Sequence, residues 1–195
     1  MSYKPDNQST QDTHLTSKDF SEKSLANHAF THCLFENCNF TQTSFEHSSF
    51  LSCTFKNCNF SLVKLNGCQL QGVSFSTCKI VGVEFFTCNT TLLFSINATN
   101  CFIQYCNFSD LDMKKASFQK SKIHGCHFIN TCLIEANFTH TDLKSTIFHN
   151  CNLSKANFCH AKQYVIAPQT NNVKKAKFSF PEVMGLLKGF DITIV

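Results

Sequence analysis

Large apolar residues recur at every fifth position of this chain, and most of them are phenylalanine. One series runs from residue 30 to residue 85 and a second from residue 103 to residue 158. A period of five fits neither an α-helix, with 3.6 residues per turn, nor a strand, with a period of two. The pattern therefore predicts a repeat architecture.

The polar positions follow the same period. If the large apolar residue of each unit is called position i, eleven of the thirteen cysteines stand at i−2, where Ala, Val and Thr are the other common residues. Position i−1 is polar and often Asn or Asp, as at Asn137 and Asn157. Each unit thus reads small, polar, large apolar, polar, polar.

This unit resembles the motif A(D/N)LXX of the pentapeptide-repeat family, with Phe at its centre. Residues 136–140 (ANFTH) and 156–158 (ANF) match it directly, and the resemblance covers roughly residues 18–160. It implies an all-β fold, a right-handed, four-sided β-helix in which each pentapeptide forms one side and four form a coil. It also implies that the side chains at i and i−2 point inward and the other three outward.

Residues 20 apart in sequence should then stack in columns, because neighbouring coils lie about 4.8 Å apart. Phe108, Phe128 and Phe148 fall in one such column, and Met113 and Leu133 in an aliphatic one. We expect about seven coils, each buried against its neighbours, so that stability is roughly a sum over coils.

The chain divides into three segments. Residues 1–17 are polar and expected to be flexible, residues 18–160 form the β-helix, and residues 161–195 form a C-terminal cap or dimerisation segment. Within the β-helix the period shifts by three between residues 90 and 101. This shift is either decay of the repeat or a protruding loop in which Leu92, Leu93 and Phe94 contact a partner, since loops on rigid scaffolds often carry function.

The C-terminal segment predicts a helix followed by a strand. Ser179 and Glu182 have the spacing of a capping box, and residues 191–195 alternate apolar and polar. The apolar stripe either covers the open end of the β-helix or joins two copies. Its residues are Val183, Leu186, Leu187, Phe190, Ile192 and Ile194.

The cysteines favour packing over disulfides or metal binding. A thiol at i−2 is a small, buried group that alternates with alanine and valine, and the spacing C-x4-C is not that of a zinc site. His124, Cys126 and His127 are the best metal candidate, but Cys126 should point inward and both histidines outward. Cys132 and Cys159 fall outside the i−2 position and should be more exposed. So many free thiols favour a reducing, cytoplasmic location.

The charge is weakly positive, with a net charge of +4 for the chain. Residues 20–160 hold ten lysines and eight acidic residues, a difference of +2. Lys114, Lys115, Lys120 and Lys122 form a basic cluster that is either a solvated face or a site for an anionic partner. Arginine, the usual reader of bases and phosphates, is absent, so direct nucleic-acid binding is not expected. No secretory signal or membrane-spanning stretch is recognisable, so no membrane partner is expected.

Enzyme motifs are missing from the sequence. It contains no G-x-S-x-G, P-loop, H-E-x-x-H or dinucleotide fingerprint. We therefore expect no catalytic residue, cofactor or metal.

The ending of the chain, residues 183–195, is similar to that of quinolone-resistance (Qnr-type) and microcin immunity proteins. In that subgroup the terminal element joins two β-helices, and the acidic, DNA-like dimer binds DNA gyrase or topoisomerase IV. A DNA mimic should be strongly acidic, which this chain is not. The sequence thus predicts a non-catalytic binding scaffold, with a Qnr-like topoisomerase-interacting protein as the leading function. The alternative is a general protein-interaction scaffold with an unrelated partner.

Overall fold

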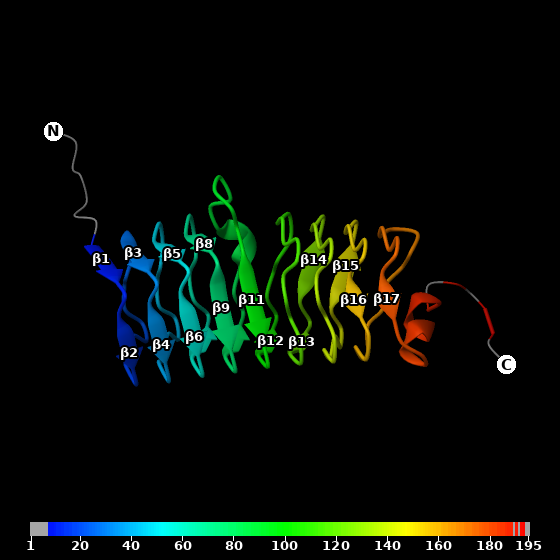
Figure 1. The fold of residues 1–195 in the computed structure, drawn as a ribbon, viewed down its shortest axis with the longest axis horizontal. Coiled ribbons are helices and arrows are strands. Elements are labelled where there is room, and N and C mark those ends of the chain that lie inside the picture. The colour runs from blue at the N-terminus through cyan, green and yellow to red at the C-terminus, as the bar shows by residue number, and fades with distance from the viewer. Residues whose placement is uncertain (1–7, 189, 191, 194–195) are drawn as a thin grey trace.

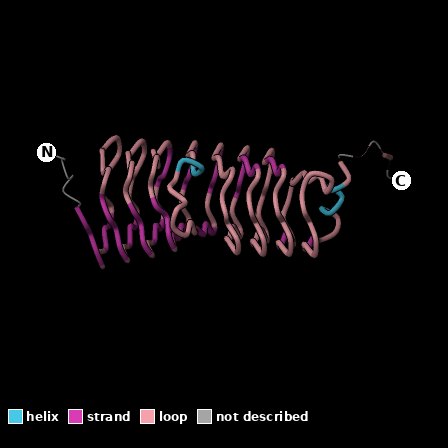
Figure 2. The backbone as a smooth tube through the Cα atoms, turned by 90° about the horizontal axis from the view of Figure 1, so that it is seen from above, coloured by secondary structure: helices cyan, strands magenta, loops and turns pink. Residues whose placement is uncertain are grey.

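The protein is a straight stack of parallel β-coils. The computed structural model describes residues 8–188, 190, 192 and 193. These form a right-handed, four-sided β-helix of about nine coils rather than the seven expected, and the coils are stacked in chain order along the rod (Figure 1). The view from above shows the same stack, with short strands separated by corners (Figure 2). The predicted fold class is confirmed.

The strands fall on four sides, which we name A to D, and every strand pair is parallel. Side A holds β1 (Gln8–Gln11), β3 (His28–Thr31), β5 (Ser49–Leu51) and β8 (Gln69–Gln71). Side B holds β2 (His14–Thr16), β4 (Leu34–Glu36), β6 (Thr54–Lys56), β9 (Val73–Ser76), β11 (Ile96–Thr99), β16 (Asn157–Phe158) and β17 (Lys177–Phe178). Side C holds β7 (Asn59–Ser61), β10 (Lys79–Val81), β12 (Phe102–Gln104) and β13 (Lys122–His124). Side D holds the 3-10 turn η1 (Phe85–Thr87), β14 (His127–Ile129) and β15 (Ile147–His149), and a second 3-10 turn, η2 (Glu182–Leu186), follows the last coil.

The register between neighbouring coils is 20 residues over most of the rod, as in the pairing of Phe35 with Phe55. It becomes 23 where Ile96 pairs with Val73, which is the predicted phase shift. It falls to 18 where Val165 pairs with Ile147. The longer register coincides with a loop that projects from the rod (Figure 1), and the shorter register coincides with a surface groove.

The core consists of stacked side chains from positions i and i−2. The rings of Phe108 and Phe128 lie 4.9 Å apart at 8°, and those of Phe128 and Phe148 lie 5.1 Å apart at 4°. Across the centre of the rod, Phe128 meets Phe118 nearly edge to face, at 79°. The predicted columns are confirmed, and parallel stacking along the axis is combined with edge-to-face contact across it, both favourable for aromatic pairs.

The corners explain two of the outward positions. The residue at i+2 has a left-handed backbone, with φ of 55° at Asn37 and 53° at Asn57. Asn, Asp and Gly tolerate this conformation best. At i−1, Asn39 accepts hydrogen bonds from the backbone N–H and the hydroxyl of Thr41 (3.1 and 2.7 Å). The Asn or Asp at i−1 thus fixes the backbone of its own side up to the corner that follows.

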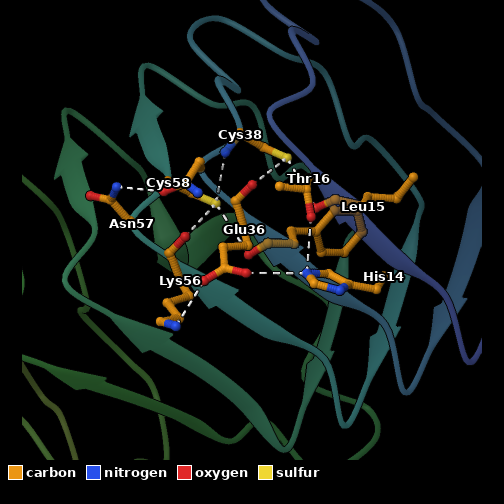
Figure 3. Close-up of polar contacts among 10 residues, drawn as sticks. His14, Leu15, Thr16, Glu36, Cys38, Lys56, Asn57 and Cys58 are labelled. Carbon is orange, nitrogen blue, oxygen red and sulfur yellow. Dashed lines mark hydrogen bonds and ion pairs between the residues drawn. The ribbon is translucent and has the colours of Figure 1, made fainter.

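The thiols at i−2 have a polar role that the sequence pattern did not predict. Cys58 accepts a hydrogen bond from the backbone N–H of Cys38 (3.4 Å), and its thiol donates to the carbonyl of Phe35 (3.4 Å) (Figure 3). One thiol thus joins the two backbone groups that a tight turn would pair directly. At other corners the backbone closes the turn itself, as where Ala136 N–H donates to Leu133 O at 3.0 Å. We call a corner open where a side chain from the next coil bridges these two groups, and closed where the backbone pairs them directly. The interpretation of these cysteines as packing groups equivalent to alanine is therefore wrong at the open corners.

The boundaries predicted for the β-helix, residues 18 and 160, both need correction. Beyond residue 160 the stack continues to residue 178, because Lys162 pairs with Asp142 and β17 pairs with β16. Residues 8–17 already belong to the stack, because β1 pairs with β3 and β2 with β4 in full register. The apolar pattern is weak here, but backbone hydrogen bonds to the next coil do not depend on side chains. Residues 1–7 of the segment predicted to be flexible lie outside the described residues.

The C-terminal helix prediction was also wrong in kind. η2 is a five-residue 3-10 turn with Pro181 at its N-cap position and no side-chain cap bond. Ser179, the predicted cap, instead accepts a hydrogen bond at its Oγ from the backbone N–H of His160 (2.7 Å). Ile192 and Thr193 are not in a strand, and the rest of the predicted strand lies outside the described residues.

Candidate interaction surfaces

A loop projects from the rod where the register lengthens to 23 residues, above β9 and β11 (Figure 1). Its two ends are fixed to the preceding coil: Asn89 N–H donates to Cys68 O, and Ser95 N–H donates to Leu70 O (2.9 Å each). Within the loop, the Asn89 side chain accepts from the N–H of Thr91 at 2.9 Å. The three extra residues therefore form a loop with fixed ends.

Three residues of this loop were predicted to contact a partner. Leu92 and Leu93 are 57% and 67% exposed, whereas Phe94 is only 5% exposed and belongs to the core. Phe94 is therefore a packing residue that fastens the loop to the rod. The two adjacent leucines form an exposed apolar tip, which we call the leucine loop.

The four lysines predicted as one basic cluster lie on two edges of the rod. Lys115 and Lys120 both occupy left-handed corners, with φ of 60° and 57°, and these corners bound side B on opposite edges. Lys122 is on side C, in β13. Lys114 pairs with Asp112 at 2.7 Å, and this carboxylate raises the pKa of Lys114. The sequence cluster therefore does not form a single cationic patch.

Other charges on the outer faces form ladders between coils. On side B, Glu36 lies between His14 (3.2 Å) and Lys56 (2.7 Å), one residue from each of three successive coils (Figure 3). The Lys56 ammonium lowers the pKa of Glu36. On the edge that carries Lys115, Lys155 pairs with Glu135 at 3.0 Å. Exposed pairs of this kind contribute little stability and give no sign of a reactive site.

The C-terminal apolar residues separate into two groups. Val183, Leu186 and Leu187 are half-buried, and Leu186 packs against the core of the last coil. Phe190 and Ile192 are 44% and 56% exposed, and Ile194 lies outside the described residues. The half-buried group lies against the end of the rod through Leu186, and the second group faces solvent.

Phe180 is an exposed residue that the sequence reasoning missed, since it is 82% exposed beside the cap. The sequence could have indicated this exposure, because Phe180 falls outside the five-residue period and immediately precedes Pro181.

No metal centre is formed by the part of the chain that the structure describes, where no three His, Cys, Asp or Glu side chains are grouped to hold an ion. Cys126 is buried, His124 lies on side C at 3.0 Å from Asp142, and His127 is exposed on side D. The predicted separation of this trio is confirmed. All thirteen cysteines are free, and Cys132 and Cys159 are the two that are partly exposed, as expected. None of the described helices is long and apolar enough to cross a bilayer.

Comparison with known proteins points to one repeat class. The sequence matches the pentapeptide repeat region over residues 28–97 and pentapeptide repeats over residues 93–128 and 123–159. No curated protein matches the chain.

Solved structures share the fold. A trypsin-treated variant of QnrB1, a plasmid-mediated fluoroquinolone resistance protein, matches with a TM-score of 0.70 and 15% identity, covering 96% of this chain and 100% of that chain. HetL, a pentapeptide repeat protein involved in heterocyst differentiation regulation in the cyanobacterium Nostoc, matches with a TM-score of 0.64 and 17% identity, covering 88% and 85%. At these identities the likeness concerns the fold.

Proposed function

The chain belongs to the pentapeptide-repeat family, and on this premise we propose that it is a non-catalytic scaffold that binds a protein partner. The leucine loop is the observation that carries the proposal. Two adjacent, exposed leucines stand on an insertion whose ends are hydrogen-bonded to a rigid rod. Apolar side chains presented in this way lose little conformational freedom on binding, which favours their use as anchors.

We propose DNA gyrase or topoisomerase IV as the leading partner, which is a finer proposal than the scaffold itself. The structural likeness to QnrB1 and the similar C-terminal residues support it. The charge argues against mimicry of DNA, because the chain carries +4. The contact would therefore be made by the leucine loop rather than by an acidic stripe.

The charge also favours the alternative, a scaffold with an unrelated partner. Residues 94–195 contain eleven lysines and six acidic residues, a net charge of +5, against −1 for residues 1–93 with six lysines and seven acidic residues. A partner with an acidic surface would suit the C-terminal half of the rod better than the DNA-binding groove of a topoisomerase.

We further propose that the protein is a homodimer joined through its C-terminal end and that it is cytoplasmic. The exposed Phe180, Phe190 and Ile192 support the first proposal, since a monomer would leave them in water. The thirteen unpaired thiols support the second.

The experiment is a binding measurement with purified gyrase and topoisomerase IV. We expect wild-type protein to bind one of them, and the double variant Leu92→Ser/Leu93→Ser to lose at least about tenfold in affinity. Leu62→Ser is the matched control, because Leu62 is 50% exposed but lies on another corner.

Two other results are informative. If neither enzyme binds but a partner captured from the native cell is lost with the loop variant, the unrelated-partner scaffold is correct. If the loop variant retains every partner at full affinity, the leucine loop is not the binding site.

A further inference from the structure

Side D carries a groove near the C-terminal end of the rod, and its cause is a local change of register. Val165 pairs with Ile147 at a spacing of 18 residues, while Asn172 pairs with Asn152 at 20. Two residues are thus lost before Val165 and regained before Asn172, where residues 168–170 form a turn. The coil is therefore two residues shorter than its neighbour up to Val165 and regains the full length by Asn172. A groove of about 600 Å³ lies on side D at this place.

The exposed surface of the groove is mainly apolar, although Ser145, Thr146, His149 and Gln163 also line it. Ile129, Ile147, Val165 and Ala167 line it, with Thr170 contributed by the turn. Ile147 and Val165 are each 48% exposed, in successive coils of the same column. No lysine or acidic residue is among the lining residues. Two neighbouring branched side chains left half in water favour an occupant with apolar groups.

Lysines stand beside this groove on side C. Lys144 and Lys162 directly precede Ser145 and Gln163, which line the groove. Among the residues that the structure describes, no carboxylate lies within 4.0 Å of either ammonium group. One acidic side chain lies nearby: Asp142 is 3.0 Å from His124 and accepts a hydrogen bond from the backbone N–H of Lys144 at 3.2 Å. Two lysines against this one carboxylate give the edge of the groove a net positive charge, in a half of the chain with a net charge of +5 from eleven lysines and six acidic residues.

We propose that this groove is a docking site for a segment of a protein partner in which apolar and acidic side chains alternate. The apolar side chains would cover Ile147 and Val165, and the carboxylates would face Lys144 and Lys162 across the shared edge. The apolar groove and the lysines at its edge would act together, because burial of apolar groups gives affinity, and charge complementarity gives specificity and a fast association rate. The proposal goes beyond the leucine loop, which stands on a different coil and is tested by different variants.

The first test uses a fluorescein-labelled eight-residue peptide with alternating Leu and Glu, measured by fluorescence anisotropy. Three probes are its comparisons: the same peptide with Ser for Leu, the same peptide with Lys for Glu, and a single-stranded oligonucleotide of similar length. We expect the Leu-Glu peptide to bind at least about tenfold more tightly than each of these. Equal binding of the Ser-Glu peptide or of the oligonucleotide would show a merely electrostatic surface and overturn the proposal.

The second test uses matched variants. Ile147→Glu and the double variant Lys144→Glu/Lys162→Glu should each weaken the Leu-Glu peptide at least about tenfold. Leu62→Glu is the control for the first, since Leu62 is 50% exposed on the same rod. Lys79→Glu is the control for the second, because Lys79 belongs to side C but lies several coils away in β10. Equal loss in a variant and its control would reject the groove as the site.

The remaining occupant to exclude is a second copy of this chain. Sedimentation of wild type and Ile147→Glu, without peptide, decides the matter. We expect the same mass for both proteins. A lower mass for Ile147→Glu would show that the groove is a contact between copies, which contradicts the proposal.

Discussion

The sulfur of Cys58 lies 3.4 Å from the backbone nitrogen of Cys38 in the preceding coil, and the Cys58 thiol also donates to the carbonyl of Phe35. The arrangement repeats one coil later, where Cys78 joins Cys58 N–H (3.4 Å) and Phe55 O (3.3 Å). Hydroxyl and amide side chains do the same further along: Ser121, Thr146 and Asn171. The i−2 position at open corners therefore selects small residues that both accept and donate.

Cys58→Ala should destabilise the protein by about 1–2 kcal/mol, because it leaves the buried N–H of Cys38 without a partner. Cys58→Ser should cost less, since a hydroxyl occupies the same position at Ser121. Urea unfolding measures both values. Cys68→Ala is the control: Cys68 is equally buried, but the corresponding N–H one coil earlier, that of Ser48, donates to Phe45 O at 3.0 Å and does not need the thiol. A Cys68→Ala cost as large as that of Cys58→Ala would mean that only volume matters.

Phe128→Ala should cost about 3–5 kcal/mol, the usual range for a buried phenylalanine. Phe128 is stacked between Phe108 and Phe148 and meets Phe118 edge to face, so neighbouring rings cannot close the cavity without leaving their own columns. Lys120→Ala, at an outward corner, should stay within about 0.5 kcal/mol. If thermal unfolding shows equal losses, position 128 does not have the inward role that the structure gives it.

Gly125→Ala tests the corners. Gly125 has φ of 61°, and a Cβ there would lie 2.8 Å from Cε1 of Tyr105, whose ring covers this corner from the preceding coil. We expect a loss of about 1–3 kcal/mol from strain and contact together. In the double variant with Tyr105→Ala, the contact disappears and only the left-handed strain remains. A double-mutant cycle by thermal unfolding should therefore show partial rescue, and strictly additive losses would contradict it.

The five-residue period predicted the fold, the inward positions and the phase shift because it reports burial directly. Phe128 and Leu133 are core residues in the sequence prediction and in the structure. The period is silent about hydrogen bonds, so it could not distinguish Cys58, at an open corner, from Cys68, at a closed one. It also missed residues 8–17, which are held by backbone pairing rather than by apolar side chains.

The candidate sites were harder to predict for a geometric reason. Lys115 and Lys120 are neighbours in sequence but occupy two corners, because five residues span one complete side of the rod. Phe94 has the apolar character of Leu92 and Leu93, yet it turns into the core. The side D groove depends on a change of register at Val165, where the period had already ended.

The two groups of C-terminal residues should respond differently to substitution. Leu186→Ala should lower stability by about 2–4 kcal/mol, because Leu186 packs against the last coil. Phe190→Ser/Ile192→Ser should leave stability nearly unchanged and convert the proposed dimer to a monomer, since both residues are exposed. Sedimentation equilibrium and thermal unfolding separate the two effects. A monomeric wild-type protein at high concentration would contradict the proposed dimer and leave the segment as a cap.

The thiols predict a loss of stability at alkaline pH. Burial raises the pKa of Cys53 to about 11 and that of Cys88 to about 12, whereas the thiol of an unfolded cysteine has a pKa of about 8.5. Because the folded pKa is the higher one, the contribution of these groups is fully present below about pH 8.5 and is lost as the pH rises toward about 11–12. The melting temperature should thus be nearly flat with respect to these thiols up to about pH 8 and fall above it. Cys53→Ser/Cys88→Ser should weaken that alkaline fall, and an unchanged slope would mean that other groups cause it.

The same burial predicts how the native protein reacts with an aromatic disulfide reagent at pH 8. Cys132 and Cys159 are partly exposed and the other eleven cysteines are buried. Because the thiolate is the reactive form and must also be reached, two thiols should react quickly and eleven only at the rate of unfolding. Unfolding in urea should make all thirteen thiols react quickly. The variant Cys132→Ser/Cys159→Ser should lose the fast phase and keep its melting temperature, and a fast phase that survives in this variant would show that the coils open in the native state.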